Sequence, residues 1–161
     1  MKFMMNGAVT IGTLDGANVE ILEEVGNENF FLFGLTVEGV QRLRAEGYRP
    51  EERYEADAEL RDALDALSSG VFSGGDREVF RPVVENLVHH DPFLVLADYR
   101  AYVDAQAAVE EAWRHEEGWT RASILNVARS GRFSSDRAIR EYCREIWNVE
   151  PLPVPESGES A

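Results

Sequence analysis

Lysine is almost absent from this sequence of 161 residues, in which a single lysine, Lys2, accompanies fifteen arginines. Basic residues are also few beside acidic ones, 16 against 30, and the formal net charge at pH 7 is −14. A protein that binds nucleic acid or an anionic lipid surface needs a basic face that neutralises phosphates. The composition therefore argues against nucleic-acid binding and against docking on a membrane surface.

Cysteine and long apolar runs are scarce as well. The one cysteine, Cys143, cannot form a disulfide within the chain, so nothing indicates an oxidising compartment. No apolar run approaches the roughly 18–20 residues that span a bilayer. The stretch from Met1 to Gly7 lacks the charged lead and the long apolar centre of a signal peptide. We therefore expect a cytoplasmic protein.

The first fifty residues alternate between strand and helix patterns. The run Asn29–Leu35 is hydrophobic on both faces, which is typical of a strand buried in a parallel sheet. The β-α-β-α order of residues 1–47 predicts an α/β fold with a doubly wound sheet. The expected elements are a strand at Val9–Ile11, a helix from an Asp15 cap to Gly26, a strand at Asn29–Leu35, and a helix from a Thr36 cap to Gly47.

From residue 50 onward the pattern is predominantly helical, above all over residues 57–147. Asp57 precedes one amphipathic segment and Asp76 begins another. The run Phe93–Tyr99 fits either a strand or an extended connector, since periodicity does not distinguish them. Three further helices are expected at about 99–115, 118–130 and 135–147.

The last helix has the clearest pattern, with Ser135 as its cap. Its apolar stripe consists of Ile139, Tyr142, Cys143, Ile146 and Trp147. Trp113, Trp119 and Trp147 occupy positions typical of a helical core, and Cys143 is expected to be a buried thiol. Residues 148–161 are rich in proline and small polar residues, so they are predicted to form a disordered tail.

Two or three strands do not make a sheet that can cover this many helices. Sheets in globular proteins average about five to six strands. We therefore expect this chain to be one end of a larger α/β unit.

Lys2 is the first candidate for chemistry. A lysine whose pKa is lowered by desolvation can attack an aldehyde and hold it as an imine. The apolar neighbours Phe3, Met4 and Met5 could provide that desolvation. The alternative is a solvated lysine without a chemical role, which the residues alone favour.

Two other motifs have structural explanations that we prefer. Gly12–Ala17 places glycines between a strand and a helix, where phosphate can bind, but it fits neither the dinucleotide fingerprint nor the P-loop. A tight turn explains it better. His89-His90-Asp91 suggests a metal site, yet adjacent helical histidines point about 100° apart. A favourable helix C-terminus explains them better, and no metal is expected.

Read as a string, the chain strongly resembles the C-terminal end of the α-glucan phosphorylases, the family of glycogen, starch and maltodextrin phosphorylases. The resemblance runs in family order from Met1 to about Pro151. The stretches that carry it include "MKFMMNGAVTIGTLDGANVEI", "EVGNENFFLFGL", "HHDPFLVLADYRAYV" and "WTRASILNVARSGRFSSDRAIREYCREIW".

The resemblance implies a retaining glycosyltransferase that cleaves α-1,4-glucans with inorganic phosphate and releases glucose 1-phosphate. The family holds pyridoxal 5′-phosphate as a Schiff base on the lysine of a motif that is Met1-Lys2-Phe3-Met4 here. Lys2 is thus implied to bind the cofactor. Residues 1–147 are implied to be the C-terminal portion of a Rossmann-like cofactor-binding domain of the GT-B type. The parent enzyme is implied to be a homodimer.

The resemblance carries over no catalytic residue. In relatives a glycine-rich segment precedes the lysine motif, and the other cofactor, phosphate and glucan contacts lie in preceding regions, whereas this sequence starts at Met1. We therefore expect no phosphorolysis from the isolated chain, a frayed start around Lys2, and an uncovered patch on the last helix. The alternative function is a non-catalytic folding or interaction module that complements a separate N-terminal chain.

Overall fold

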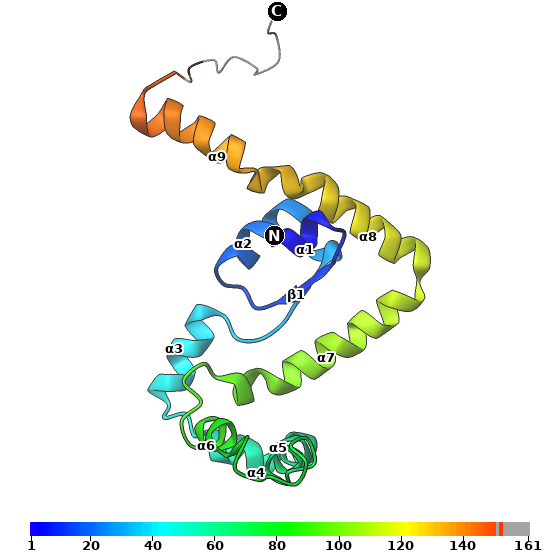
Figure 1. Cartoon of the computed structure of the whole chain (residues 1–161), viewed down its shortest axis with the longest axis vertical. Coiled ribbons are helices and arrows are strands. Elements are labelled where there is room, and N and C mark those ends of the chain that lie inside the picture. Colours follow the sequence, from blue (N-terminus) through cyan, green and yellow to red (C-terminus); the bar gives the residue numbers. More distant parts are fainter. Residues whose placement is uncertain (151, 153–161) are drawn as a thin grey trace, which may run out of the picture.

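The computed structural model describes residues 1–150 and residue 152. This part of the chain is mostly helical, with a small two-stranded sheet near its start. Figure 1 shows an elongated arch in which α7 and α8 run between a helical group at one end and α9 at the other. The helices are α1 (Lys2–Met5), α2 (Ala17–Val25), α3 (Val37–Ala45), α4 (Pro50–Ala56), α5 (Ala58–Ser68), α6 (Arg81–His89), α7 (Val95–Arg114), α8 (Glu116–Arg129) and α9 (Ser135–Glu141).

The two strands, β1 (Thr10–Gly12) and β2 (Phe30–Leu32), run parallel with Ile11 opposite Phe31. They are joined by α2 and a 3₁₀ turn, η1 (Asn27–Asn29), so the expected β-α-β order is confirmed. The second strand is shorter than predicted and is not buried on both faces, because Leu32 is 44% exposed. A parallel strand is buried on both faces only where helices cover both sides of its sheet, and among the described residues the side that carries Leu32 lacks such cover.

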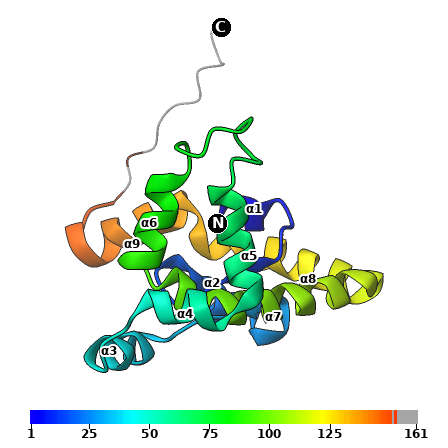
Figure 2. The same cartoon turned by 90° about the horizontal axis from the view of Figure 1, so that it is seen from below.

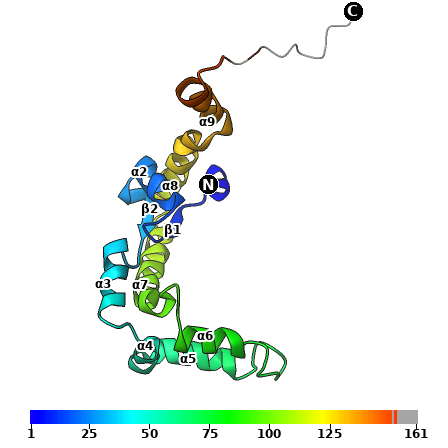
Figure 3. The same cartoon turned by 90° about the vertical axis from the view of Figure 1, so that its left-hand side faces the viewer.

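One core joins the start of the chain to α8. Met4, Ile21, Val25 and Phe30 form a buried apolar cluster, against which Phe133 packs. Helices α1 and α2 lie against α8, as Figure 3 shows for α2, and β2 contacts α7. A second core lies at the other end of the arch, where α4, α5, α6 and the start of α7 pack together (Figure 2). Its buried residues are Leu60, Leu64 and Leu96.

Buried amides fix α8 against the strand region. The side chain of Asn126 is fully buried, and its Nδ2 donates to the carbonyl of Asn29 at 3.1 Å and to that of Ala122 at 3.0 Å. Asn29 is buried as well and donates from its Nδ2 to the carbonyl of Val25. Since a buried polar group is costly unless it is paired, these bonds hold the two segments in one register.

Thr36 is the helix cap that the sequence predicts, and Asp57, which is expected only to precede its helix, caps it as well. The Thr36 hydroxyl accepts from the amide of Gly39 at the start of α3, and Asp57 accepts from two amides at the start of α5. Two others differ. α2 begins after Gly16, whose φ of 48° suits glycine, rather than at an Asp15 cap. α9 has Ser134 rather than Ser135 before its first residue, with no side-chain cap.

The boundaries of two more helices differ from the predictions. α6 begins at Arg81 rather than at Asp76, with Pro82 in its first turn, where proline is best tolerated. The run Phe93–Tyr99 is neither strand nor connector, because α7 begins at Val95 after Leu94 adopts the left-handed conformation. Apolar residues on all sides of a short segment do not distinguish a helix start from a strand.

The end of the described chain is a continuous helical stretch whose apolar side is open to solvent. α9 continues into a π-helix, η3 (Tyr142–Trp147). Ile146 and Trp147 are 68% and 55% exposed, in agreement with the expected uncovered patch. The core positions predicted for Trp113 and Trp147 are therefore wrong for this chain, since Trp113 is exposed too. Most of the predicted tail, residue 151 and residues 153–161, lies outside the described residues.

No helix among the described residues has both the length and the apolar character needed to cross a bilayer.

Candidate functional site

Lys2 lies on α1, the short helix at the start of the chain, with its side chain exposed. Within residues 1–150 its amine makes neither a hydrogen bond nor an ion pair. The apolar neighbours do not cover it as the sequence suggests: Met4 is 1% exposed and belongs to the core, whereas Phe3 is 83% exposed. The amine is therefore a free, accessible primary amine rather than a desolvated one.

The helix that carries Lys2 is anchored at its far side. Met4 enters the core beside Ile21, and the Asn6 side chain donates to the carbonyl of Lys2 at 2.8 Å. The chain then turns at Gly7, where φ is 84°. The Ser123 hydroxyl on α8 donates to the Gly7 carbonyl at 2.8 Å across 116 residues of sequence. The expectation of a frayed start is therefore wrong, because α8 holds α1 in place.

The glycine loop between β1 and α2 is a tight turn whose polar groups form hydrogen bonds with one another. Asn18 Nδ2 donates to the Thr13 carbonyl at 3.0 Å, and the Thr13 hydroxyl donates to Asp15 at 3.2 Å. A Cβ atom on Gly12 would lie 2.6 Å from Asn18 Nδ2, so a larger residue there would push the Asn18 amide away from its bond to Thr13. The contacts support the structural explanation of this motif over a phosphate loop.

In the motif His89-His90-Asp91, the histidine and the aspartate that make contacts have different partners. His89 Nδ1 lies 3.2 Å from Glu51 Oε1 on α4, in an exposed pair. Asp91 is 2% exposed and accepts from the amides of Val95 and Leu96 at the start of α7. Among the described residues, no group of three histidine, cysteine or acidic side chains is placed to hold a metal.

Asp91 and Ser123 are the residues whose structural importance the sequence did not indicate. Asp91 precedes its helix by four residues, which is outside the usual capping position, and Ser123 acts on a partner far away in sequence. The only sequence signal for the role of Asp91 is that it stands four residues before Val95, at the beginning of an apolar run.

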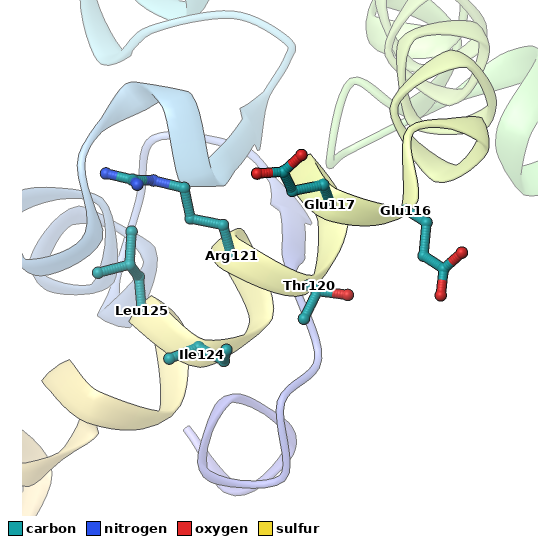
Figure 4. Close-up of a pocket in the computed structure, with 6 residues that line it drawn as sticks. All are labelled: Glu116, Glu117, Thr120, Arg121, Ile124 and Leu125. Atoms are coloured by element: carbon teal, nitrogen blue, oxygen red, sulfur yellow. The ribbon is translucent and has the colours of Figure 1, made fainter.

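A hollow of about 760 Å³ runs along one side of α8. Figure 4 shows its six lining residues, all from this helix, with the carboxylates of Glu116 and Glu117 directed apart. Ile124 exposes an apolar surface in the middle. Because one helix supplies every lining group and the acids diverge, this hollow has no converging catalytic pair.

The described residues thus provide one element of a cofactor site. An exposed amine on an anchored helix fits covalent attachment of an aldehyde cofactor. Within residues 1–150, no hydrogen bond joins Lys2 or its helix to the Gly12–Ala17 turn or to His89.

The family model described as carbohydrate phosphorylase matches residues 1–149. The chain belongs to the carbohydrate phosphorylase family. It is 57% identical over 154 residues to glycogen phosphorylase of Synechocystis sp., and 56% identical over 157 residues to the brain form of glycogen phosphorylase from Rattus norvegicus. It is 52% identical over 160 residues to the muscle form from Oryctolagus cuniculus.

These matches cover 96–97% of the chain. The chain spans only 18–19% of the length of these phosphorylases. The resemblance identified in the sequence is confirmed as family membership, and the predominantly helical fold with its small parallel sheet is that of part of a phosphorylase.

Proposed function

We propose that this chain is the cofactor-lysine portion of an α-1,4-glucan phosphorylase and that Lys2 holds pyridoxal 5′-phosphate. The observation that carries the proposal is the combination of family membership over residues 1–149 with one lysine, which is accessible and mounted on an anchored helix. When bound, the cofactor supplies a phosphate group that exchanges a proton with the substrate phosphate. The amine of Lys2 serves as its tether.

The same proposal covers the larger architecture. The parallel pair of strands with an intervening helix supports the assignment of residues 1–147 to the C-terminal portion of a doubly wound domain of the GT-B type. The exposed side chain of Leu32 supports a further layer packed on that face of the sheet. The partners proposed for the whole enzyme are its N-terminal portion, α-1,4-glucan, inorganic phosphate and a second subunit, in the cytoplasm.

For the 161-residue chain alone we expect no release of glucose 1-phosphate from glucan and phosphate. Phosphorolysis requires the sugar, the substrate phosphate and the cofactor phosphate to be positioned together. The described residues provide the tethering amine without a surrounding cradle of cations.

A second candidate function is that of a non-catalytic module that complements a separate N-terminal chain. The exposed apolar side of α9 and η3 favours it, because such a face is suited to cover by another polypeptide. Co-expression with an N-terminal phosphorylase chain tests this role, since complementation restores activity only in the mixture. The first role adds that Lys2→Arg in the co-expressed chain abolishes the restored activity.

The single lysine makes the cofactor proposal easy to test. The chain has only two aliphatic amines, the side chain of Lys2 and the α-amine of Met1. The chain is incubated with pyridoxal phosphate, reduced with borohydride, and the label is located by fragmentation of the N-terminal peptide. The proposal expects label at Lys2, with weak overall retention because the residues that the structure describes form no phosphate cradle around it.

The matched control is Lys2→Arg, which keeps the charge but cannot condense with the aldehyde. Label confined to the α-amine of Met1, and equal in both proteins, contradicts the proposal. So does a full-length phosphorylase carrying this sequence that keeps its bound cofactor and its turnover after Lys2→Arg.

A further inference from the structure

A second hollow, of about 360 Å³, lies where the two parallel strands end. Thr13 follows β1 and Phe33 follows β2, and the first turns of α7 form the opposite wall. The carboxyl ends of parallel strands are the usual place for ligands in open α/β sheets. Lys2 is not among the lining residues, which are Thr13, Phe33, Phe93, Val95, Asp98, Tyr99 and Tyr102.

Four of the lining residues are aromatic. Phe33 and Tyr102 meet edge to face, with 5.3 Å between ring centroids and 62° between ring planes. The Phe93 side chain is 85% exposed, so its ring is available to a ligand from solvent. Tyr99 already has the guanidinium of Arg100 5.5 Å from its ring centroid. Because aromatic faces carry negative electrostatic potential, a cluster of this kind attracts a cation.

The acidic group in the hollow is only partly used. Asp98 Oδ1 accepts from the amide of Leu35 at 2.9 Å. Its Oδ2 lies over Gly34, where φ is 81° and a Cβ atom would come within 2.7 Å of it. Within residues 1–150 this second oxygen has no hydrogen-bond or ion-pair partner. Burial raises the pKa of Asp98, and a cation beside the carboxylate would offset that desolvation.

Two of the other polar groups of the lining already take part in hydrogen bonds. The Thr13 hydroxyl donates to Asp15, and the Tyr102 hydroxyl accepts from Gln106 at 2.8 Å. An anion needs a basic partner, and the lining residues include none, so the hollow does not suit an anion. Arg100 does not supply that charge, because Asp57 and Glu59 hold its guanidinium. What remains is a carboxylate oxygen beside aromatic rings.

We propose that this hollow is a binding site for a small organic cation of the quaternary ammonium class, held against the aromatic rings of the lining and balanced by Asp98. A quaternary ammonium group donates no hydrogen bonds, so it requires only the aromatic faces and the charge that the hollow offers. The site does not depend on the function proposed for Lys2.

Choline is the probe, and its uncharged isostere with carbon in place of nitrogen is the control ligand. Each is titrated into the 161-residue chain at fixed ionic strength, and the amide signals of residues 33–35 and 93–102 are followed by NMR. We expect saturable shifts confined to these segments, with choline binding at least about fivefold more tightly than the isostere. Equal affinities for the two probes would show a merely apolar hollow and overturn the proposal.

Variants distinguish binding in this hollow from non-specific attraction of a cation to the acidic chain. Asp98→Asn keeps an oxygen to accept from Leu35 but removes the charge, and it should weaken choline binding about tenfold while leaving the isostere unaffected. Tyr102→Leu should weaken choline more than the isostere. Asp104→Asn on the same helix changes the net charge equally but lies outside the lining, and it should bind choline normally. Equal weakening by Asp98→Asn and Asp104→Asn, or shifts spread over the acidic surface, would contradict the proposal.

Discussion

The hydroxyl of Tyr48 donates a 2.7 Å hydrogen bond to Oδ2 of Asp91, which lies 43 residues further along the chain. Asp91 is buried with a φ of 37°, and its two oxygens also accept from the amides of Val95 and Leu96 at 2.8 Å. Burial, together with the bond to Asp91, raises the pKa of Tyr48 far above its ordinary value of 10.0. One carboxylate therefore joins the segment before α4 to the first turn of α7.

This relationship predicts that Asp91→Asn is strongly destabilising. The amide nitrogen replaces one acceptor with a donor, so a buried hydroxyl or backbone N–H loses its partner. Asparagine tolerates a positive φ almost as well as aspartate, so the backbone adds little. We expect the free energy of unfolding to fall by about 2–3 kcal/mol, and by about 1–2 kcal/mol in Tyr48→Phe. Urea unfolding measures both losses. If Asp91→Asn changes the free energy of unfolding by less than about 0.5 kcal/mol, as a typical surface substitution does, the prediction is wrong.

The ion pair between Asp57 and Arg100 predicts a loss of stability in acid. Asp57 accepts from the Arg100 guanidinium, at 2.6 Å for its shortest contact, and also from the amide of Leu60. These bonds, above all that from Arg100, hold the pKa of Asp57 below its ordinary value of 3.8. A lowered pKa in the folded state stabilises the fold above the ordinary value, and this contribution is lost as the pH falls through the lowered value.

The measurement is urea unfolding from neutral pH to well below pH 3.8. Asp57→Asn should remove part of the acid dependence and lower stability at neutral pH, where the wild-type carboxylate is charged. Added salt should reduce the difference because the pair is partly exposed. Asp62→Asn, an exposed acid on the same helix, is the matched control. If both variants keep the wild-type acid profile, the pair does not contribute.

The contact between Gly7 and Ser123 predicts a non-additive pair of substitutions. Gly7→Ala forces a Cβ into a position with φ of 84°, only 2.7 Å from the Ser123 hydroxyl oxygen. We expect a loss of about 1–2 kcal/mol for Gly7→Ala and about 1 kcal/mol for Ser123→Ala. The double variant should lose less than the sum, because Ser123→Ala removes the steric conflict while the strained φ remains. Additive losses in urea unfolding would show that the two residues act independently.

Hydrogen exchange gives the same contact a second test. The amides of Asn6, Gly7 and Ala8 donate to carbonyls of α1 at 2.9–3.0 Å. Ser123→Ala should speed their exchange while amides of α5, at the other end of the arch, exchange as before. Uniform acceleration would indicate a global loss of stability rather than release of the helix that carries Lys2.

Features determined by neighbouring residues could be predicted from the sequence. Thr36 and Asp57 cap their helices through amides two or three residues away, and the strand-helix-strand order follows from local hydrophobic periods. The start of α7 was missed because its cap, Asp91, acts over four residues and needs Leu94 in the left-handed conformation.

Long-range packing explains what could not be predicted about the site. Lys2 was identified from its motif, but no local pattern indicates that Met4 enters the core while Phe3 remains in solvent. That choice depends on the core that α2 and β2 form around Met4 and on the contact of α1 with α8, more than a hundred residues away. The hollow beside Asp98 is likewise assembled from the ends of two strands, a loop and a helix. Its members are unremarkable one by one, so only the folded chain brings them together.

The open apolar side of α9 and η3 predicts that the isolated chain associates. Ile139, Tyr142, Ile146 and Trp147 are all about half exposed or more, and Tyr142 and Trp147 pack edge to face with 5.8 Å between ring centroids. Contiguous apolar surface of this kind promotes self-association, whereas a net charge of −14 opposes it.

Sedimentation velocity should therefore show an average mass that rises with protein concentration and with salt, because salt screens the repulsion. Ile146→Glu places a charge within the apolar side and should shift the chain towards monomer. Val37→Glu is the matched control, since Val37 is an exposed apolar residue on α3, outside this surface. Equal effects of the two substitutions would mean that added negative charge, rather than the surface of α9 and η3, governs association. A monomer at every concentration and salt level would show that this surface does not pair with a copy of itself, and it would leave cover by a different polypeptide as the explanation for its apolar composition.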